Sequence, residues 1–121
     1  VLAQTGELMN KTDRIQSEIM KRLSVLIKDS VRDPRVVGCI IGITDVKVDS
    51  ELSRALISVS VYGGDGEQAV QGLNHSAGFL RSRLKELIDM RTMPALVFVL
   101  DRGAEYAAEI EAIIKSIRKD S

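Results

Sequence analysis

The sequence predicts one α+β domain in which helices pack against a three-stranded sheet. Segments with an apolar residue every three or four positions, typical of amphipathic helices, alternate with β-branched runs, typical of strands. The chain has 121 residues, of which 45% are hydrophobic. This is the size of one ordinary domain and is enough for one buried core. We assign residues 12–118 to this domain, 1–11 to a flexible N-terminal segment and 119–121 to a C-terminal tail.

The first half of the chain predicts a helix followed by two strands of a hairpin. Residues 13–27 carry an apolar residue every four positions, and Thr12 or Asp13 provides a side-chain oxygen that can cap the start. The helix should end before the Asp33-Pro34 pair, because proline disfavours helical geometry in the residue ahead of it. Residues 36–48 and 54–62 are rich in β-branched residues, with a polar connection at 49–53. The apolar phase changes near Thr44-Asp45, which predicts a β-bulge there.

The second half predicts a helix, a break, a second helix, a strand and a last helix. Residues 67–75 are helical, and the break falls at 76–78, where Gly78 disfavours a continuous helix by about 1 kcal/mol relative to alanine. Leu80, Leu84, Leu87 and Ile88 form the apolar stripe of the next helix, which Met93-Pro94 stops. Residues 95–100 are continuously apolar, as expected for a strand buried on both sides, and 104–118 form a final helix. A ferredoxin-like sandwich needs a strand at the start, but residues 12–27 have helical periodicity.

Charge is balanced overall but unevenly placed along the chain. The 17 basic residues equal the 17 acidic ones, which argues against a protein that holds nucleic acid by bulk attraction alone. Residues 79–91 are mainly basic and residues 101–112 mainly acidic. No apolar stretch is long enough to span a bilayer. Cys39 is the only cysteine, so no internal disulfide can form, and a lone thiol in an apolar run fits a reducing compartment.

Five segments, in order, resemble the ribosome-binding factor A family and span residues 13–117. They are Arg32-Asp33-Pro34-Arg35, Ile43-Thr44-Asp45-Val46-Lys47-Val48, Val59-Ser60-Val61-Tyr62-Gly63, Ser76-Ala77-Gly78-Phe79-Leu80-Arg81-Ser82 and Met90-Arg91-Thr92-Met93-Pro94-Ala95-Leu96-Val97-Phe98. The order of elements is that of the type II KH domain. The chain departs from the family at Ser76, where alanine is typical, and at Ala95, where glutamate is usual, so the contact that glutamate makes is in doubt here.

The resemblance implies a non-catalytic factor that needs no cofactor and no metal. Its partners would be the free small (30S) ribosomal subunit and the 5′ region of its 16S rRNA, with late maturation and 5′-end processing as its role, particularly in the cold. Ribosome-assembly GTPases would be indirect partners. We expect a monomer without membrane contact, in the cytoplasm or an organelle. In this family the interhelical bend replaces the Gly-x-x-Gly loop with which ordinary KH domains clamp RNA.

The candidate RNA-binding residues lie around that bend and on the helix that follows it. The set is Arg32, Arg35, Ser76, Gly78, Arg81, Arg83, Lys85 and Arg91. Guanidinium groups suit phosphate because they donate hydrogen bonds in a planar fork. A helix that starts at the bend would add free backbone N–H groups. A basic helix face is more often simply exposed to solvent than used for binding. Because the chain resembles the ribosome-binding factor A family, we expect this face to bind RNA.

Two other functional classes compete with this interpretation. A protein-interaction module could use the sheet or the acidic last helix and would bind its partner independently of salt. A small enzyme is weakly supported, because His75, the only histidine, has no nucleophile or metal-ligand companions at a suitable spacing. Cys39 is most simply a core residue.

Overall fold

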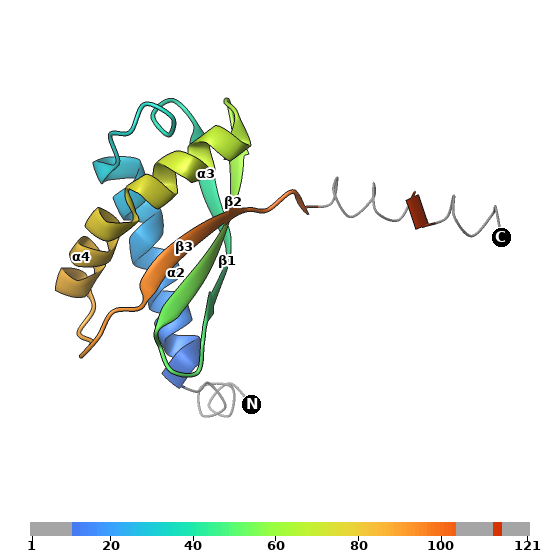
Figure 1. Cartoon of the computed structure of the whole chain (residues 1–121). Helices are drawn as coiled ribbons and strands as arrows, with labels where there is room; N and C mark the ends of the chain where they lie inside the picture. Colours follow the sequence, from blue (N-terminus) through green and yellow to red (C-terminus); the bar gives the residue numbers. More distant parts are fainter. Residues whose placement is uncertain (1–10, 104–112, 115–121) are drawn as a thin grey trace, which may run out of the picture.

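The computed structural model describes residues 11–103 and 113–114, and it places the helices on one face of a three-stranded sheet (Figure 1). The elements are α2 (Lys11–Ser30), β1 (Ile40–Val48), β2 (Arg54–Tyr62), α3 (Gly66–His75), α4 (Ala77–Leu87) and β3 (Ala95–Leu100). This order confirms the predicted α+β class and, over these elements, the type II KH arrangement. Ile113 and Ile114 are helical; the rest of the predicted final helix and the segments 1–10 and 119–121 lie outside the described residues.

The sheet has the order β1-β2-β3, with β1 antiparallel and β3 parallel to the central β2. The register of β1 against β2 shifts between Ile43 and Asp45, which confirms the predicted bulge. Ile43 pairs with the buried Val59, and beyond the bulge Val46 pairs with the buried Ile57. The extra residue, Thr44, therefore keeps both halves of β1 in phase with the same inner face of β2.

Helix α2 covers the inner face of the sheet with one apolar stripe. Ile15, Ile19, Leu23 and Ile27 are all buried, as the four-residue spacing predicts. The helix is also tied to the end of β1, because the side-chain amide of Gln16 accepts the backbone N–H of Val48 at 2.9 Å. The core then continues through α3, α4 and β3, with Leu73, Leu80, Leu84, Met93 and Phe98 buried.

The first strand begins later than its β-branched residues indicate. Strand β1 starts at Ile40 rather than at Val36. The backbone N–H groups of Val36 and Val37 both donate to the carbonyl of Asp33, at 2.9 and 3.0 Å. A turn thus uses the backbone N–H donors that a strand would need. Gly38, at the end of this turn, has a positive φ of 93°. Val36 is nevertheless buried, so its apolar character serves the core and not a strand.

Two further expectations about burial were wrong. Strand β3 buries only Leu96 and Phe98, while Val99 on the other face is 36% exposed. The reason is that α2, α3 and α4 all lie on one face of the sheet (Figure 1). Helix α4 ends at Leu87, before Met93-Pro94, and Ile88 is already extended. The change of backbone direction leaves Leu87 exposed and turns Ile88 into the core.

Candidate nucleic-acid interface

Helices α3 and α4 meet at Ser76, where the helical hydrogen-bond ladder is interrupted. The backbone N–H of Ser76 donates to the carbonyls of Gly72 and Leu73, at 3.1 and 3.0 Å, and the next helical bond runs from Leu80 to the carbonyl of Ser76 at 3.0 Å. Between these bonds, the backbone N–H groups of residues 77–79 have no hydrogen-bond partner among the described residues. Such free donors at a helix start carry a partial positive charge and suit an anion.

The residue that makes the bend is Ser76 and not Gly78. Ser76 has φ −89° and ψ 0°, ends α3 and precedes α4, and its side chain makes no capping hydrogen bond. Gly78 lies in the first turn of α4 and is exposed, and a Cβ placed on it would meet no atom within 4 Å. Phe79 beside it is 49% exposed. The bend is therefore open to solvent, with unhindered access to the backbone at Gly78.

The side of the bend that belongs to α3 is fastened to the sheet by Asn74. Its side-chain amide donates to the carbonyl of Phe98 at 3.0 Å and accepts the N–H of Phe98 at 2.8 Å. Strand β3 is an edge strand, and these two bonds satisfy backbone groups that face away from β2. Asn74 is not among the residues predicted from the sequence. An asparagine in the last turn of a helix is a weak helix former, and this is the only signal that it carried.

Of the two arginines around Pro34, one is engaged within the fold and the other is free. The guanidinium of Arg35 donates to both carboxylate oxygens of Asp33, Nε to Oδ1 at 3.0 Å and Nη2 to Oδ2 at 2.9 Å. These bonds, led by the side-chain bond to Arg35, lower the pKa of Asp33 from 3.8 to about 2. Arg32 is exposed and has no partner among the described residues. Arg35 therefore shapes the turn, whereas Arg32 can bind a ligand.

The cations of α4 divide in the same way. The Nε of Arg81 donates to the carbonyl of Met93 at 2.9 Å, which holds the segment that leads into β3. Arg83 forms an ion pair with Glu86 at 3.1 Å on the exposed surface. Lys85 is exposed and has no ion pair within the described part of the chain. The predicted residues thus do not form one cluster, because they extend from the bend to the far end of α4.

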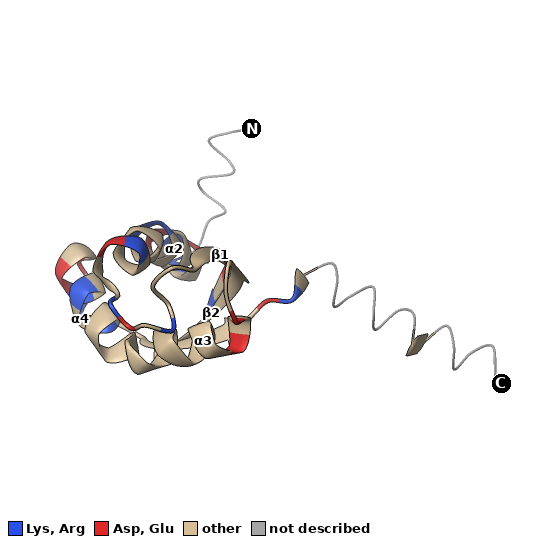
Figure 2. Cartoon of the chain, turned by 90° about the horizontal axis from the view of Figure 1, so that it is seen from above, with Lys and Arg blue, Asp and Glu red and all other residues tan. Residues whose placement is uncertain are grey.

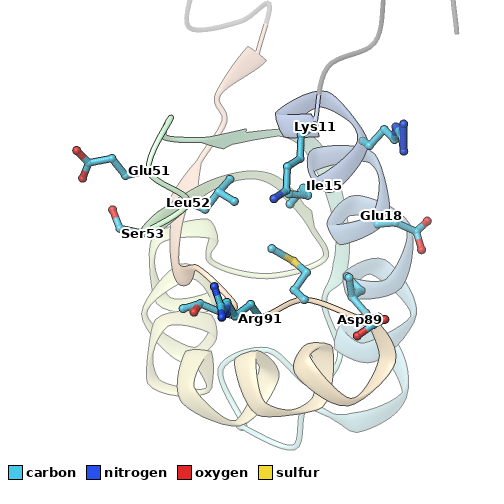
Figure 3. Close-up of a pocket in the computed structure, with 12 residues that line it drawn as sticks. Lys11, Ile15, Glu18, Glu51, Leu52, Ser53, Asp89 and Arg91 are labelled. Carbon is cyan, nitrogen blue, oxygen red and sulfur yellow. The ribbon is translucent and has the colours of Figure 1, made fainter. Parts of the chain in front are cut away.

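Arg91 lies in a hollow of about 810 Å³ at that far end (Figure 3). Its walls come from the start of α2, from the hairpin between β1 and β2, and from residues 88–92. Apolar side chains, Ile15 and Leu52 among them, line it together with three cations and three carboxylates: Lys11, Arg14, Arg91, Glu18, Glu51 and Asp89. Figure 3 shows the side chains of Glu18 and Glu51 pointing away from the hollow. Arg91 thus lines the same hollow as two α2 cations, Lys11 and Arg14, which are not among the predicted site residues.

Leu52 reaches this hollow from a hairpin loop in an unusual conformation. Its φ of 59° is rare for a residue with a side chain. Asp49 stabilises the loop, since its Oδ1 accepts the N–H groups of Ser53 and Arg54 at 2.7 and 3.1 Å, and its Oδ2 accepts the hydroxyl of Ser53. The bond from the Ser53 side chain, followed by that from the Arg54 backbone, lowers the pKa of Asp49.

Two helices, α2 and α4, carry just over half of the Lys and Arg residues in the described part of the chain. Figure 2 shows Lys and Arg positions on both α2 and α4. These helices contact each other on the inner face of the sheet. Within residues 11–103 and 113–114 no group of three His, Cys, Asp or Glu side chains could hold a metal ion. None of the described helices is long and apolar enough to cross a membrane.

Comparison with known proteins places the chain in a family. Residues 11–114 match the family model described as ribosome-binding factor A. Ribosome-binding factor A of Finegoldia magna is 37% identical over 93% of this chain and 95% of its own length. The protein of that name from Brevibacillus brevis is 36% identical over 90% of this chain and 92% of its own length.

Solved structures show the same fold. The crystal structure of ribosome-binding factor A from Thermus thermophilus has a TM-score of 0.68 at 20% identity, covering 77% of this chain and 98% of that one. A homology model of the Thermus thermophilus factor, fitted into an electron cryo-microscopy map of a 30S–RbfA complex, has a TM-score of 0.65 at 21% identity, covering 78% and 98%. From the family model and the relatives above 30% identity, this chain belongs to the ribosome-binding factor A family.

Proposed function

We propose that this chain binds the free small ribosomal subunit through its 16S rRNA and assists late maturation, including 5′-end processing, by binding and without catalysis. The observation that carries the proposal is the exposed start of α4, where three successive backbone N–H groups have no partner among the described residues. Two findings support it: the chain belongs to a family of ribosome-binding factors, and a Thermus thermophilus relative has been fitted into a map of a 30S complex.

The bend would bind one phosphate group of the rRNA backbone. Free N–H groups at a helix start donate to phosphate oxygens, and the helix dipole adds a favourable potential. Gly78 allows close approach because no side chain covers its backbone. Contacts of this kind fix the position of RNA but carry no sequence information. We therefore infer that the shape of the folded rRNA, and not its base sequence, selects the site.

The free cations would extend this contact on both sides of the bend. Arg32 lies on the segment that packs under α3, Lys85 lies on α4, and Arg91 lies beyond the end of α4. Each has an exposed side chain that can reach a phosphate. Arg35, Arg81 and Arg83 would contribute less, because each already donates to an oxygen of the protein.

Base stacking would have a small part in this recognition. Phe79 is exposed beside the bend and Tyr62 at the end of β2, but the chain holds only four Phe and Tyr residues and no Trp. Proteins that bind single strands without sequence preference use rows of aromatic side chains. We infer that the chain acts as a cytoplasmic monomer on structured rRNA, and that any effect of assembly GTPases reaches it through the subunit.

The test is co-sedimentation of the full chain with purified free small subunits. The variant Arg32→Gln/Lys85→Gln/Arg91→Gln should bind roughly 10- to 100-fold more weakly, as expected from about 0.5–1 kcal/mol for each exposed charge contact. The matched control, Lys47→Gln/Arg54→Gln/Arg102→Gln, removes three cations from other surfaces and should bind like the wild type. Equal binding of the two folded variants would show that the proposed surface is the wrong one.

One observation favours a second function, a protein-interaction module. The outer face of the sheet exposes the apolar side chains of Leu56, Tyr62 and Val99, and such exposure is typical of binding surfaces. Binding through this face would be insensitive to salt, whereas contacts between cations and phosphates weaken steeply as salt rises. A salt series in the same co-sedimentation assay separates the two functions.

A further inference from the structure

Helix α2 has a second feature besides its buried apolar stripe. Arg14, Lys21 and Lys28 recur every seven residues, close to two helical turns, so they lie along one line of the helix. That line is on the side opposite to Leu23, which is fully buried. All three are exposed, as is Val25 between them, which is 58% exposed. We call Arg14, Lys21 and Lys28 the α2 ridge.

The α2 ridge is long and straight. Seven residues of α-helix rise roughly 10.5 Å, so the ridge extends over roughly 21 Å from Arg14 to Lys28. The middle of α2 is held by its buried face, with Ile19 and Leu23 fully buried. The three cations are therefore displayed on a rigid support, which reduces the entropy lost when they bind a rigid partner.

The charges on the ridge are available, because none of its three cations has an ion pair within the described residues. Glu18 lies four residues after Arg14 and three before Lys21, so it is a neighbour of both on the helix surface. Glu18 is paired with Arg22, whose Nε lies 3.6 Å from its Oε1. Asp29 is one residue from Lys28 and projects about 100° away around the helix. The ridge thus presents three unpaired cations, and the one carboxylate that lies between two of them, Glu18, is already paired with Arg22.

We propose that the α2 ridge binds the phosphate backbone of an RNA duplex. This inference rests on the proposed function and adds a second contact surface to the bend. The ridge has no aromatic residue to stack on unpaired bases, whereas duplex RNA is recognised through its shape and phosphates. Arg32 lies two residues beyond the end of α2 and directly before the turn that packs against Gly72 of α3, so it would extend the ridge towards the bend. The chain would then hold a duplex along α2 and a single phosphate at the start of α4.

The experiment measures how the full chain binds a short RNA duplex and a single strand of equal length, by fluorescence anisotropy over a series of salt concentrations. In Arg14→Gln/Lys21→Gln/Lys28→Gln, the slope of log Kd against log salt for the duplex should fall by about 2 to 3, close to one for each lost phosphate contact. The control Lys47→Gln/Arg54→Gln/Arg102→Gln, with the same change in net charge and no change on α2, should keep the wild-type slope. Glutamine is a good helix former, so α2 should persist, which thermal unfolding followed by circular dichroism verifies.

Two results would overturn the inference. One is a ridge variant, still folded, that binds the duplex with the same slope as the control. The other is an equal loss on the duplex and on the single strand, since this would show general attraction and no duplex site. Either result leaves the proposed function standing if the wild-type chain co-sediments with small subunits. Conversely, a wild-type chain that binds the duplex through the ridge but fails to co-sediment refutes the proposed function alone.

Discussion

The two sides of the bend at Ser76 differ in how they are used. Before the bend, the last turns of α3 are packed and fastened: Gly72 lies against the turn that holds Asp33 and Arg35, and Asn74 is bonded to the backbone of β3. After the bend, the first turn of α4 is open, and a Cβ on Gly78 would meet nothing within 4 Å. The two glycines, only six positions apart, thus have different roles. Gly72 allows close packing, and Gly78 allows a ligand to approach the backbone.

Within this short segment, the residues before the bend contribute mainly to stability and those after it mainly to binding. The fastened side fixes where α3 ends, and therefore where the free N–H groups of α4 lie. The open side contributes little to the core and remains available to a ligand. Substitutions before the bend should therefore change stability first, and substitutions after it should change RNA binding first.

The largest change in stability is expected from a substitution at Gly72. A Cβ there would lie 2.8 Å from Cγ2 of Val36, 3.0 Å from Oδ1 of Asp33 and 3.2 Å from Cβ of Arg35. Val36 is buried and cannot move freely, so Gly72→Ala should destabilise the protein by about 1–3 kcal/mol. Chemical denaturation measures the change, with Gln71→Ala on the exposed side of α3 as the control. A Gly72→Ala variant as stable as the control would mean that the turn is not packed tightly against α3.

A smaller effect, dependent on pH, is expected from Asp33. The bonds from Arg35 lower the pKa of its carboxyl to about 2 from an ordinary 3.8. A carboxyl with a lowered pKa stabilises the fold fully above pH 3.8, and this contribution disappears as the pH falls to about 2. Asp33→Asn should therefore melt at a lower temperature than the wild type at neutral pH, and the gap should close between about pH 4 and 2. A gap that stays constant over this range would contradict the assigned role of the ion pair.

The sequence predicted the elements well because their periodicities are local. The bulge at Thr44 followed from a change of phase within β1, and the stripe of α2 from apolar residues four apart. What it did not predict depends on contacts between distant segments. The exposed outer face of β3 has the same apolar composition as a strand covered on both sides, and only the placement of α2, α3 and α4 on the inner face decides between the two.

The candidate site was only partly predictable, for the same reason. Arg32, Lys85 and Arg91 are free as the site requires, but Arg81 donates to Met93, twelve residues away, and nothing in its local pattern indicates this. The bend was expected from Gly78 and is made by Ser76, since glycine here provides open space and not an unusual backbone conformation. The α2 ridge also carried a local signal, the seven-residue spacing of its cations.

The smallest expected change in stability is at Gly78, where it should also have the opposite sign. Gly78→Ala places a methyl group in open space in the first turn of a helix, so it should stabilise the fold by about 0.4–1 kcal/mol, mainly by reducing the entropy of the unfolded chain. If phosphate approaches the backbone at this position, the same methyl group should weaken binding to small subunits, while Ser82→Ala on the exposed surface of α4 should not. A more stable protein that binds less well is the result that separates the two sides of the bend. Unchanged binding would show that RNA does not reach the backbone at Gly78, and it would leave the cations alone to account for the interaction.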